Sequence, residues 1–284
     1  MDESPDITAL RARLRSERMA GRRIALVPTM GYLHEGHLAL VDVARQHGDV
    51  VVLSLFVNPL QFAPGEDFDR YPRDVARDGA LAASRGVDIV FAPSVAEMYG
   101  AGRELRVTGA AAANRWEGAV RPGHFDGVLT VVAKLFNIVQ PDVACFGQKD
   151  IQQATLVREM IRELEFPIRF VMVPTVREPD GLAMSSRNGF LSPLERQSAI
   201  ALSASLRAVD VAWRGGASDP DVLRRLVEAT LAAHRSAGPL VADYIAIVDA
   251  EALAPVTRAV PGTIVALAVR LGKTRLVDNI ILGA

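Results

Sequence analysis

Two histidines three positions apart, His34 and His37, lie in the segment PTMGYLHEGHLAL at residues 28–40, directly after an apolar run. Glycines surround them in the order Gly-x-x-x-x-Gly, which is part of the phosphate-binding P-loop pattern. His37 and Leu38 replace the P-loop lysine and Ser/Thr, so that motif is largely excluded. A helix start still presents backbone N–H groups and a positive dipole end to an anion. Imidazoles one turn apart would face that anion, so the segment predicts a phosphate site.

Two other interpretations of the histidine pair stay open. A zinc site fits less well, because the helical zinc pattern spaces its histidines i, i+4 and the single cysteine, Cys145, excludes a multi-cysteine site. Cys145 lies in the apolar run DVACFG and is interpreted as a core thiol. The other interpretation is two surface histidines in a loop.

Carboxamides follow a second apolar run, in the segment FVNPLQF at residues 56–62. Asn58 and Gln61 would lie just past the carboxyl end of a buried strand, where α/β sheets bind the hydroxyls and carboxylates of their ligands. An ordinary Asn-Pro turn is the alternative.

A lysine lies at the start of a predicted helix in CFGQKDIQQATLVREM, residues 145–160. The chain has three lysines against 29 arginines, and a cation at a helix start opposes the helix dipole unless an anion binds there. Lys149 is therefore a candidate phosphate ligand. Asp150 could cap the helix, hold a ribose hydroxyl or bind magnesium, and Gln153 would point the same way one turn later.

A fourth segment, GLAMSSRNGF at residues 181–190, offers two hydroxyls and a guanidinium on a glycine-flanked loop. Ser185, Ser186 and Arg187 form a suitable clamp for phosphate oxygens. A polar turn without a ligand is the alternative.

The elements that must position these residues follow an alternating pattern. Continuous apolar runs, typical of buried parallel strands, lie at 24–29, 49–58, 87–93, 142–147 and 168–176. Amphipathic helical stretches lie between them, at 37–48, 73–86, 127–139 and 150–164. We therefore predict an α/β fold: a Rossmann-like parallel sheet that binds its ligands at the carboxyl ends of the strands.

The pattern changes near residue 175, where a turn-rich passage begins. Helical stretches at 193–214 and 219–237 precede three strand-like runs at 243–249, 263–272 and 274–282, the last two joined by the hairpin turn LGKTR. We expect a Rossmann-like nucleotide-binding domain at 1–175 and a smaller α+β domain at 176–284 that closes over the active site.

Composition excludes several classes of protein. Half of the residues are hydrophobic and 23% are charged, as in ordinary globular proteins. The formal net charge of −1 argues against a nucleic-acid partner. The longest uncharged stretch, 50–65, contains Asn58 and Pro59, so no membrane span is expected. The acidic start of the chain lacks the apolar core of a signal peptide, which predicts a cytoplasmic protein.

Taken together and in this order, the segments resemble the pantothenate synthetase (pantoate–β-alanine ligase) family. The resemblance runs from about residue 22 to the C-terminus and rests on PTMGYLHEGH, FVNPLQF, YPR (71–73), RPGHFDGV (121–128), FGQKDIQQ, PTVRE and GLAMSSRN. The histidine turn and the Met-Ser-Ser-Arg loop are also similar to the signatures of class I aminoacyl-tRNA synthetases and nucleotidylyltransferases. Gln148 stands where the family usually has Glu, and Ile151 where it usually has Tyr.

The resemblance implies a reaction in two steps. The carboxylate of pantoate attacks the α-phosphorus of ATP, giving pantoyl adenylate and pyrophosphate, with magnesium bridging phosphates. The amine of β-alanine then displaces AMP. The resemblance also implies that the first domain binds ATP and pantoate, and that the protein is a homodimer.

Site residues follow from motif position within the resemblance. His34, His37 and Lys149 would be catalytic, with His37 as general acid or proton donor. Gln61 and Gln153, with Asn58, would bind pantoate, Gln61 would be shared with β-alanine, and Asp78 would bind magnesium. The ATP site would comprise Met30, Gly31, Tyr32, Leu33, His34, Glu35, Gly36, His37, Gly147, Gln148, Lys149, Asp150, Val176, Met184, Ser185, Ser186 and Arg187.

Three alternative functions remain at this point. Another adenylate-forming enzyme, such as a tRNA synthetase, would keep the ATP residues, but the near-neutral chain leaves no room for a tRNA-reading domain. A histidine-based metallohydrolase would need bound zinc. A nucleotide-sensing module would bind ATP without releasing pyrophosphate.

Overall fold

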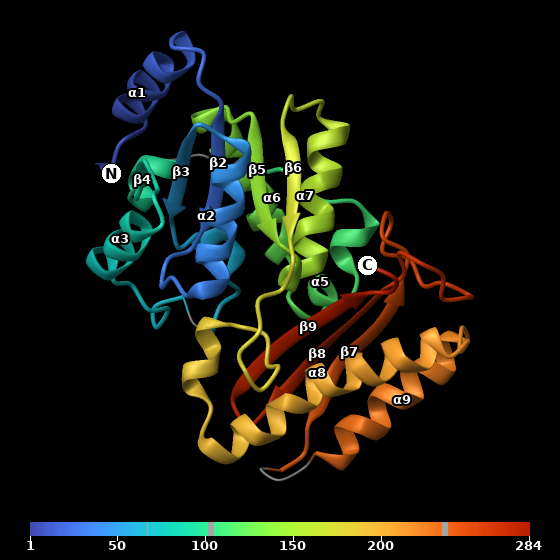
Figure 1. Ribbon diagram of the computed structural model, residues 1–284. Helices are drawn as coiled ribbons and strands as arrows, with labels where there is room; N and C mark the ends of the chain where they lie inside the picture. Colours follow the sequence, from blue (N-terminus) through green and yellow to red (C-terminus); the bar gives the residue numbers. More distant parts are fainter. Residues whose placement is uncertain (67, 102–104, 235–237) are drawn as a thin grey trace.

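The computed structural model describes residues 1–66, 68–101, 105–234 and 238–284, which form two sheets with their own helices (Figure 1). The strands are β1 (Asp2–Ser4), β2 (Ile24–Thr29), β3 (Val50–Leu55), β4 (Ile89–Phe91), β5 (Val143–Gly147), β6 (Arg169–Val173), β7 (Val241–Val248), β8 (Ile264–Leu271) and β9 (Thr274–Ile281). The α-helices are α1 (Ile7–Met19), α2 (Glu35–His47), α3 (Val75–Ser84), α4 (Val95–Tyr99), α5 (Glu117–Val120), α6 (His124–Val139), α7 (Ile151–Glu163), α8 (Pro193–Arg214) and α9 (Pro220–Ala233). Short 3₁₀ turns are η1 (Pro59–Gln61), η2 (Ala111–Asn114), η3 (Gln148–Asp150) and η4 (Ser186–Phe190).

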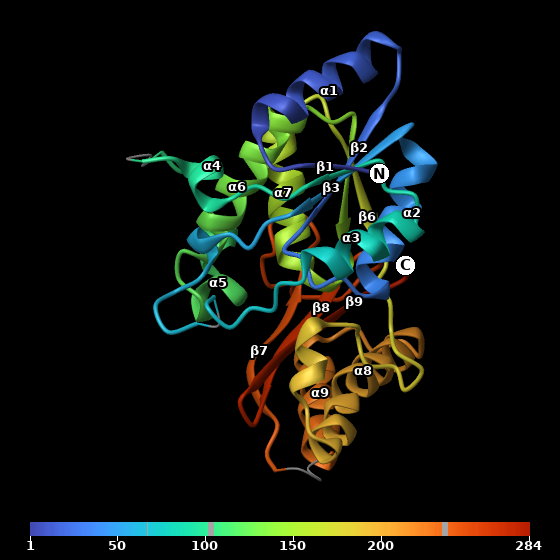
Figure 2. The same ribbon diagram turned by 90° about the vertical axis from the view of Figure 1, so that its left-hand side faces the viewer.

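The first sheet is parallel throughout, with the strand order β1-β4-β3-β2-β5-β6. Its central strands are apolar on both faces because helices cover both (Figure 2). Helices α2 and α3 pack on one face, and α1, α6 and α7 pack on the other. This arrangement confirms the predicted Rossmann-like α/β fold.

The order of the strands fixes where a ligand fits. The chain runs outward from β2 through β3 to β4, and then returns to add β5 and β6 on the other side of β2. Between β2 and β5, the loops that leave the carboxyl ends of the strands turn to opposite faces, which opens a crevice there. His34 and His37 follow β2, and Lys149 follows β5. The sequence therefore supplies chemically active side chains at this crevice.

The second sheet is antiparallel, in the order β7-β8-β9, and lies beyond the carboxyl ends of the first (Figure 1). Helices α8 and α9 cover one of its faces. Its other face packs on the start of α7, where Ile151 is buried among Ala246, Val248 and Ile264. The smaller α+β unit is confirmed, and an apolar Ile151 suits this contact. The boundary at residue 175 stays a prediction.

Helix α1 and strand β1 were not predicted from the sequence. Helix α1 is rich in arginine and buries few apolar side chains, chiefly Leu10 and Leu14, and Asp6 caps its N-terminus. The helix expected at 219–237 ends at Ala233, and residues 235–237 lie outside the described residues. Within the described ranges, no helix combines the length and the apolar character needed to cross a membrane.

Candidate active site

Two adjoining cavities lie at the carboxyl ends of the parallel strands. A cavity of about 220 Å³ is enclosed by the loops after β2, β3, β5 and β6, and one of about 960 Å³ lies between this edge and the second sheet. The four predicted segments are brought together at the smaller cavity. Several side chains line both cavities, namely Arg121, His124, Lys149, Asp150, Gln153, Ser185 and Arg187.

His34 and His37 form a capping box at the start of α2. The backbone N–H of Gly36 donates to His34 Nδ1 at 3.1 Å, and that of His34 donates to His37 Nδ1 at 3.3 Å. The two rings lie 4.0 Å apart between centroids. Because both Nδ1 atoms accept hydrogen bonds, the neutral tautomer carries its proton on Nε2. Both imidazoles therefore keep one N–H group for a ligand in the smaller cavity.

Burial keeps both imidazoles neutral. It lowers the pKa of His34 from 6.5 to about 4, with the Lys149 ammonium adding to the effect. For His37, burial and then its neighbours His34 and Lys149 lower the pKa to about 3. At neutral pH the pair acts as two uncharged hydrogen-bond donors, which can stabilise charge without first losing a proton.

These lowered pKa values predict a loss of stability in acid. Below pH 6.5 these two histidines bind protons in the unfolded chain but stay unprotonated in the folded protein. The free energy of unfolding therefore falls as the pH drops toward 4. Each histidine should contribute a loss on the order of 1–2 kcal/mol between pH 7 and pH 5. Urea unfolding at both pH values measures it. The double variant His34→Asn, His37→Gln keeps the helix capped and should lose less; an equal loss would contradict the assignment.

Two residues between β2 and α2 make the turn that carries the histidines. Gly31 and Tyr32 have φ values of 86° and 51°, in the left-handed region. Asp78, on α3, accepts the N–H groups of Tyr32 and Leu33 at 2.6 and 2.8 Å and is 2% exposed. Both of its oxygens are engaged by the backbone. These contacts support a role in holding the turn, and magnesium ligation by Asp78 stays a prediction.

Gly36, between the two histidines, has no room for a side chain. A Cβ atom there would lie 2.8 Å from His34 Cε1. Glycine is therefore required if His34 is to fold back on its own helix start.

Asn58 and Gln61 differ in what they face. Asn58 is 1% exposed; its oxygen accepts from Tyr99 Oη at 2.6 Å and its Nδ2 donates to the Gly127 carbonyl at 3.0 Å and to Gln61 Oε1 at 3.2 Å. Gln61 lines the smaller cavity, and Asn58 is not among the described residues that do. Asn58 therefore orients Gln61, and its contact with substrate stays a prediction.

Helix α6 approaches this turn through a glycine. A Cβ atom on Gly127 would overlap the carbonyl of Leu60, so the backbone of α6 lies directly against η1. The next turn of the helix directs Val128 and Val131 into the smaller cavity. Helix α6 therefore supports the turn that carries Gln61 and also forms an apolar wall beside this side chain.

Lys149 and Asp150 lie at the junction of the two cavities. The Lys149 ammonium donates to Asp150 Oδ1 at 3.3 Å. Burial by itself would raise the pKa of Asp150, but the ammonium outweighs it and the pKa lies below its ordinary value. Asp150 occupies the N-cap of α7, yet among the described residues its carboxylate contacts Lys149 and does not cap the helix. Its carboxylate is therefore not used for helix capping.

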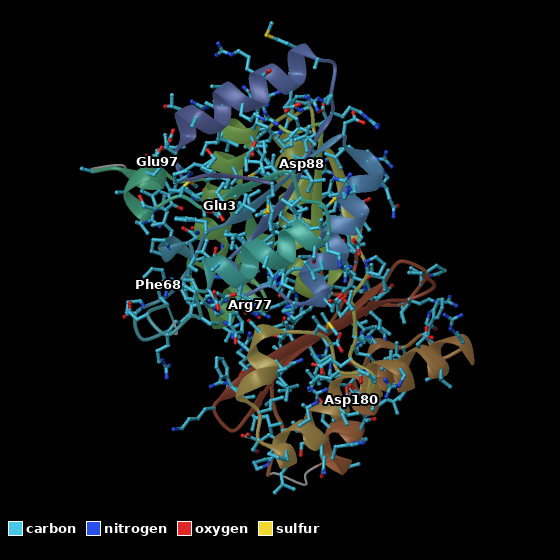
Figure 3. All side chains as sticks on the ribbon, turned by 60° about the vertical axis from the view of Figure 1, so that its left-hand side comes forward. Glu3, Phe68, Arg77, Asp88, Glu97 and Asp180 are labelled. Carbon is cyan, nitrogen blue, oxygen red and sulfur yellow. The ribbon has the colours of Figure 1, made fainter. Side chains whose placement is uncertain are left out.

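The other predicted ATP residues divide into two groups. Met30, Gly147, Val176, Met184 and Ser186 line the smaller cavity with those already named, and the Met184 N–H donates to the Val176 carbonyl at 2.9 Å. Four residues face elsewhere. Glu35 pairs with Arg85, Leu33 lies in the core, and Gln148 contacts Asn279. Tyr32 lies under the guanidinium of Arg77, which Figure 3 shows where the first unit faces the second.

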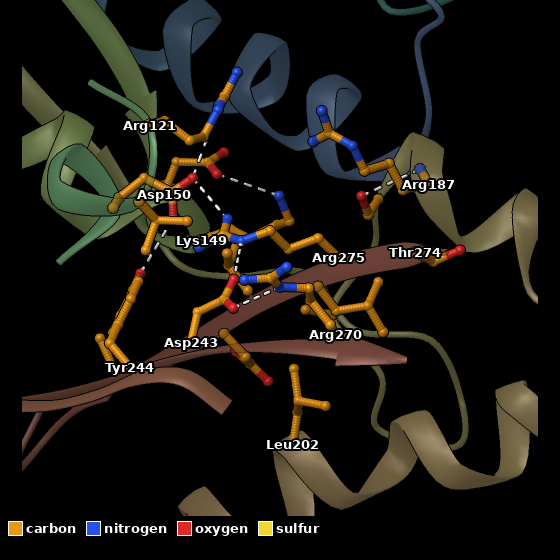
Figure 4. Close-up of a pocket in the computed structure, with 18 of the residues that line it drawn as sticks. Arg121, Lys149, Asp150, Arg187, Leu202, Asp243, Tyr244, Arg270, Thr274 and Arg275 are labelled. Carbon is orange, nitrogen blue, oxygen red and sulfur yellow. Dashed lines mark hydrogen bonds and ion pairs between the residues drawn. The ribbon is translucent and has the colours of Figure 1, made fainter. Parts of the chain in front are cut away.

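Some residues at the site were missed by sequence reasoning. Arg121 and His124 belong to the quoted segment RPGHFDGV but were given no role; each lies near the Gln61 carbonyl, the His124 Nδ1 at 2.8 Å. Figure 4 shows side chains of the second sheet facing Lys149 and Asp150 across the larger cavity. Among them, Arg275 donates to Glu117 and Asp243, both at 2.7 Å. No local motif marks these strand residues.

A parallel sheet with imidazoles, a lysine and a hydroxyl–guanidinium loop at its switch point defines an α/β protein of the class that binds small ligands at the strand ends. The chain matches the family model described as pantoate-beta-alanine ligase over residues 4–281, and it belongs to that family. It is therefore an enzyme, a ligase of pantothenate biosynthesis.

Relatives and solved structures agree with this assignment. The pantothenate synthetase of Moorella thermoacetica is 51% identical over 97% of this chain and 96% of its own length, and that of Heliobacterium modesticaldum is 53% identical over 94% of each. The pantothenate synthetase of Thermus thermophilus has a TM-score of 0.93 at 49% identity over 99% of both chains. The Francisella tularensis pantoate-beta-alanine ligase, complexed with beta-gamma ATP and beta-alanine, has a TM-score of 0.80 at 33% identity, covering 99% of this chain and 97% of that one.

Proposed function

We propose that this enzyme joins pantoate to β-alanine at the cost of ATP, through a pantoyl-adenylate intermediate, and releases AMP and pyrophosphate. The observation that carries the proposal is the convergence of His34, His37, Lys149 and Arg187 beside the carboxamides Gln61 and Gln153 around one cavity. Phosphate-binding donors and acid-binding carboxamides are thus within reach of the same small substrate. The ATP and β-alanine complex of the Francisella relative supports the same substrates here.

In the first step, a carboxylate oxygen of pantoate attacks the α-phosphorus of ATP. An O–P bond forms, the bond to the bridging oxygen breaks, and the electron pair leaves with pyrophosphate. Negative charge then grows on the bridging oxygen, and the Nε2–H groups of His34 and His37 and the Lys149 ammonium are the donors to meet it. Fixed donors of this kind each contribute on the order of 10²–10³ in rate. The low pKa of His37 favours a hydrogen-bond donor over the general acid first inferred from the resemblance.

The nucleotide is assigned to the strand-end side of the cavity. Gly147 and Val176 flank it after β5 and β6, with the Val176 carbonyl already joined to Met184. Ser185, Ser186 and Arg187 follow at once and would hold phosphate oxygens.

Pantoate is assigned to the α6 side of the cavity. Gln61 and Gln153 offer amide donors and acceptors for its carboxylate and hydroxyls, and Val128 and Val131 offer an apolar surface for its two methyl groups. In the second step the neutral amine nitrogen of β-alanine attacks the acyl carbon, the C–O bond to AMP breaks with its electron pair leaving on AMP, and the nitrogen releases a proton to water. Gln61 lies where both the acid and the incoming amine would be held.

Magnesium fits the site as an ion held mainly by the substrate. In the described part of the chain, no group of three His, Cys, Asp or Glu side chains could hold a metal by itself. Among the residues that the structure describes, Asp150 is the one carboxylate that lines both cavities beside Lys149. One carboxylate with phosphate oxygens and water is a normal magnesium environment, and an ion bound there would neutralise phosphate charge. The homodimer and the cytoplasmic location stay predictions.

ATP/pyrophosphate exchange tests the proposal directly. Labelled pyrophosphate should enter ATP only when pantoate is present, because exchange requires reversible adenylate formation. A nucleotide-sensing module would give no exchange. An adenylate-forming enzyme with another acid substrate would exchange with that acid instead of pantoate, and a zinc hydrolase would lose activity when zinc is removed with magnesium in excess.

Gln61→Ala is expected to weaken the binding of pantoate far more than the binding of ATP. Losing one neutral hydrogen bond at a buried site costs roughly 1–3 kcal/mol, about a 5- to 150-fold rise in the KM of pantoate. Exchange kinetics with each substrate varied in turn measure the two effects. Gln197→Ala, an exposed carboxamide on α8, is the matched control. Equal losses for pantoate and ATP would remove Gln61 from the acid pocket.

A further inference from the structure

A single asparagine of the second sheet holds the backbone around Lys149. Asn279 lies on β9 and is 1% exposed. Its Nδ2 donates to the carbonyls of Gln148 at 2.8 Å and of Lys149 at 2.9 Å, while Gln148 Nε2 donates to its Oδ1 at 3.2 Å. Both amide hydrogens of one side chain are thus used on two successive peptide groups.

The neighbouring residue fastens a second segment of the site. Asp278 receives a bidentate ion pair from Arg177, at 2.7 and 2.9 Å, and its side chain is 1% exposed. Its Oδ1 also accepts the backbone N–H of Asn279 at 2.8 Å. Arg177 follows Val176 and pairs with Ala183, just before the Met184–Arg187 loop. Two adjacent residues of β9 therefore hold the loops after β5 and after β6.

We propose that Asn279 is a positioning residue for adenylate formation, which acts by fixing the place of Lys149. This inference rests on the proposed function. Lys149 lies in η3, a single 3₁₀ turn that follows Gly147 and, within the described part of the chain, has no side-chain cap. Such a turn has few hydrogen bonds of its own to set its orientation. The two carbonyls held by Asn279 belong to the peptide groups before and after the Lys149 Cα atom. Strand β9 therefore fixes this Cα atom and the direction in which the lysine side chain leaves the backbone.

The chemistry of asparagine suits this task. Its amide supplies two donors and an acceptor in one plane, which matches two carbonyls and the Gln148 amide. Gln148 donates to Asn279 Oδ1, an interaction that an ionised carboxylate could not make. The second sheet thus contributes to the first step without contacting a substrate. A displacement of about 1 Å at a reacting group can cost on the order of 10² in rate.

The test uses two uncharged replacements in the full chain. Asn279→Leu keeps the shape without hydrogen bonds, and Asn279→Ala leaves space for water to bond the two carbonyls if the leucine variant folds poorly. Pantoate-dependent exchange should fall by about 10-fold or more in kcat, while reaction of β-alanine with preformed pantoyl adenylate changes by less than about 3-fold. Asn137→Ala, which removes an amide bonded to the Ala133 carbonyl within α6, is the matched control and should leave both rates unchanged.

Coupling to Lys149 separates positioning from general stability. In a Lys149→Ala background, replacing Asn279 should lower the rate of pantoate-dependent exchange by less than a further factor of about 3, because the group that it positions is gone. If the double variant lost rate by the product of the two single-variant factors, the proposal would be overturned, since Asn279 would then act independently of the lysine.

A ligand-free readout keeps this inference distinct from the proposed function. The chain has three lysines, so ¹³C-dimethylation gives three lysine signals, with that of Lys149 assigned by Lys149→Arg. Replacing Asn279 should shift the Lys149 signal and leave that of Lys134 in place; an unmoved Lys149 signal would overturn the inference. If the wild-type enzyme shows no pantoate-dependent exchange, the proposed function fails, and the NMR shift still decides whether Asn279 positions Lys149.

Discussion

Replacing Lys149 by alanine is expected to slow pantoyl-adenylate formation by about 10²-fold or more, as for other preorganised donors. The ammonium lies at the junction of the two cavities, beside Asp150, and Arg187 of the Met184–Arg187 loop lines both cavities as well. In the proposed mechanism, charge builds on pyrophosphate only in the first step, and AMP leaves in the second. The reaction of β-alanine with preformed pantoyl adenylate should therefore suffer much less.

Single-turnover measurements of both half-reactions test this expectation. Arg15→Ala, at an exposed position of α1 that lines neither cavity, is the matched control for loss of a positive charge. Unchanged melting temperatures would show that the variants remain folded. If Lys149→Ala slowed only the β-alanine step, the assignment of this lysine to the leaving pyrophosphate would be wrong.

His37→Ala is the second change with a large expected effect, because it should also slow adenylate formation by about 10²-fold. The imidazole does two things, since Nδ1 caps the helix by accepting the His34 N–H and Nε2–H is left for the ligand. His37→Gln retains an acceptor for the cap. A loss of rate in both variants, with stability recovered in the second, would show that the N–H toward the ligand matters beyond capping. Full activity in His37→Gln would show that the imidazole is not required.

The pH profile separates a neutral donor from an acid. With a pKa of about 3, His37 stays uncharged from pH 5 upward, so wild-type adenylation should show no inflection near 6.5 that depends on this residue. An inflection between pH 6 and 7 that disappears in His37→Ala would identify a protonated imidazolium as the working form. His47→Ala, at the other end of α2, controls for loss of a histidine.

The parallel fold was predictable because its strands are buried on both faces and read as continuous apolar runs. The convergence of the four segments was predictable for the same reason, since chemically active residues follow successive strands and the strand ends meet at one edge. What the runs could not reveal was which polar side chain at a turn faces the cavity. Asn58 and Gln61 share a turn, and partners distant in sequence, Tyr99 and Gly127, turn one of them away.

Other contacts could not be predicted for the same physical reason. Asp78 is predicted as a magnesium ligand, and the N–H groups that donate to its carboxylate belong to a turn 45 and 46 residues earlier. Asn279 acts on a loop 131 residues away, and strand residues with alternating exposure give no local signal of such a contact. Interactions between distant segments decide these roles, whereas hydrophobic periodicity reports only each segment by itself.

The tight approach at Gly127 sets a limit on redesigning the enzyme for other acids. Enlarging the apolar wall by changing Val128 or Val131 would let α6 shift, and because its backbone lies against Leu60 the shift would be passed on to Gln61. The size of the apolar wall and the position of the Gln61 amide are therefore linked, and neither would change without the other. A variant that accepts a bulkier acid would need a compensating change in the 58–61 turn, so paired libraries across these two segments would be a better starting point than either alone.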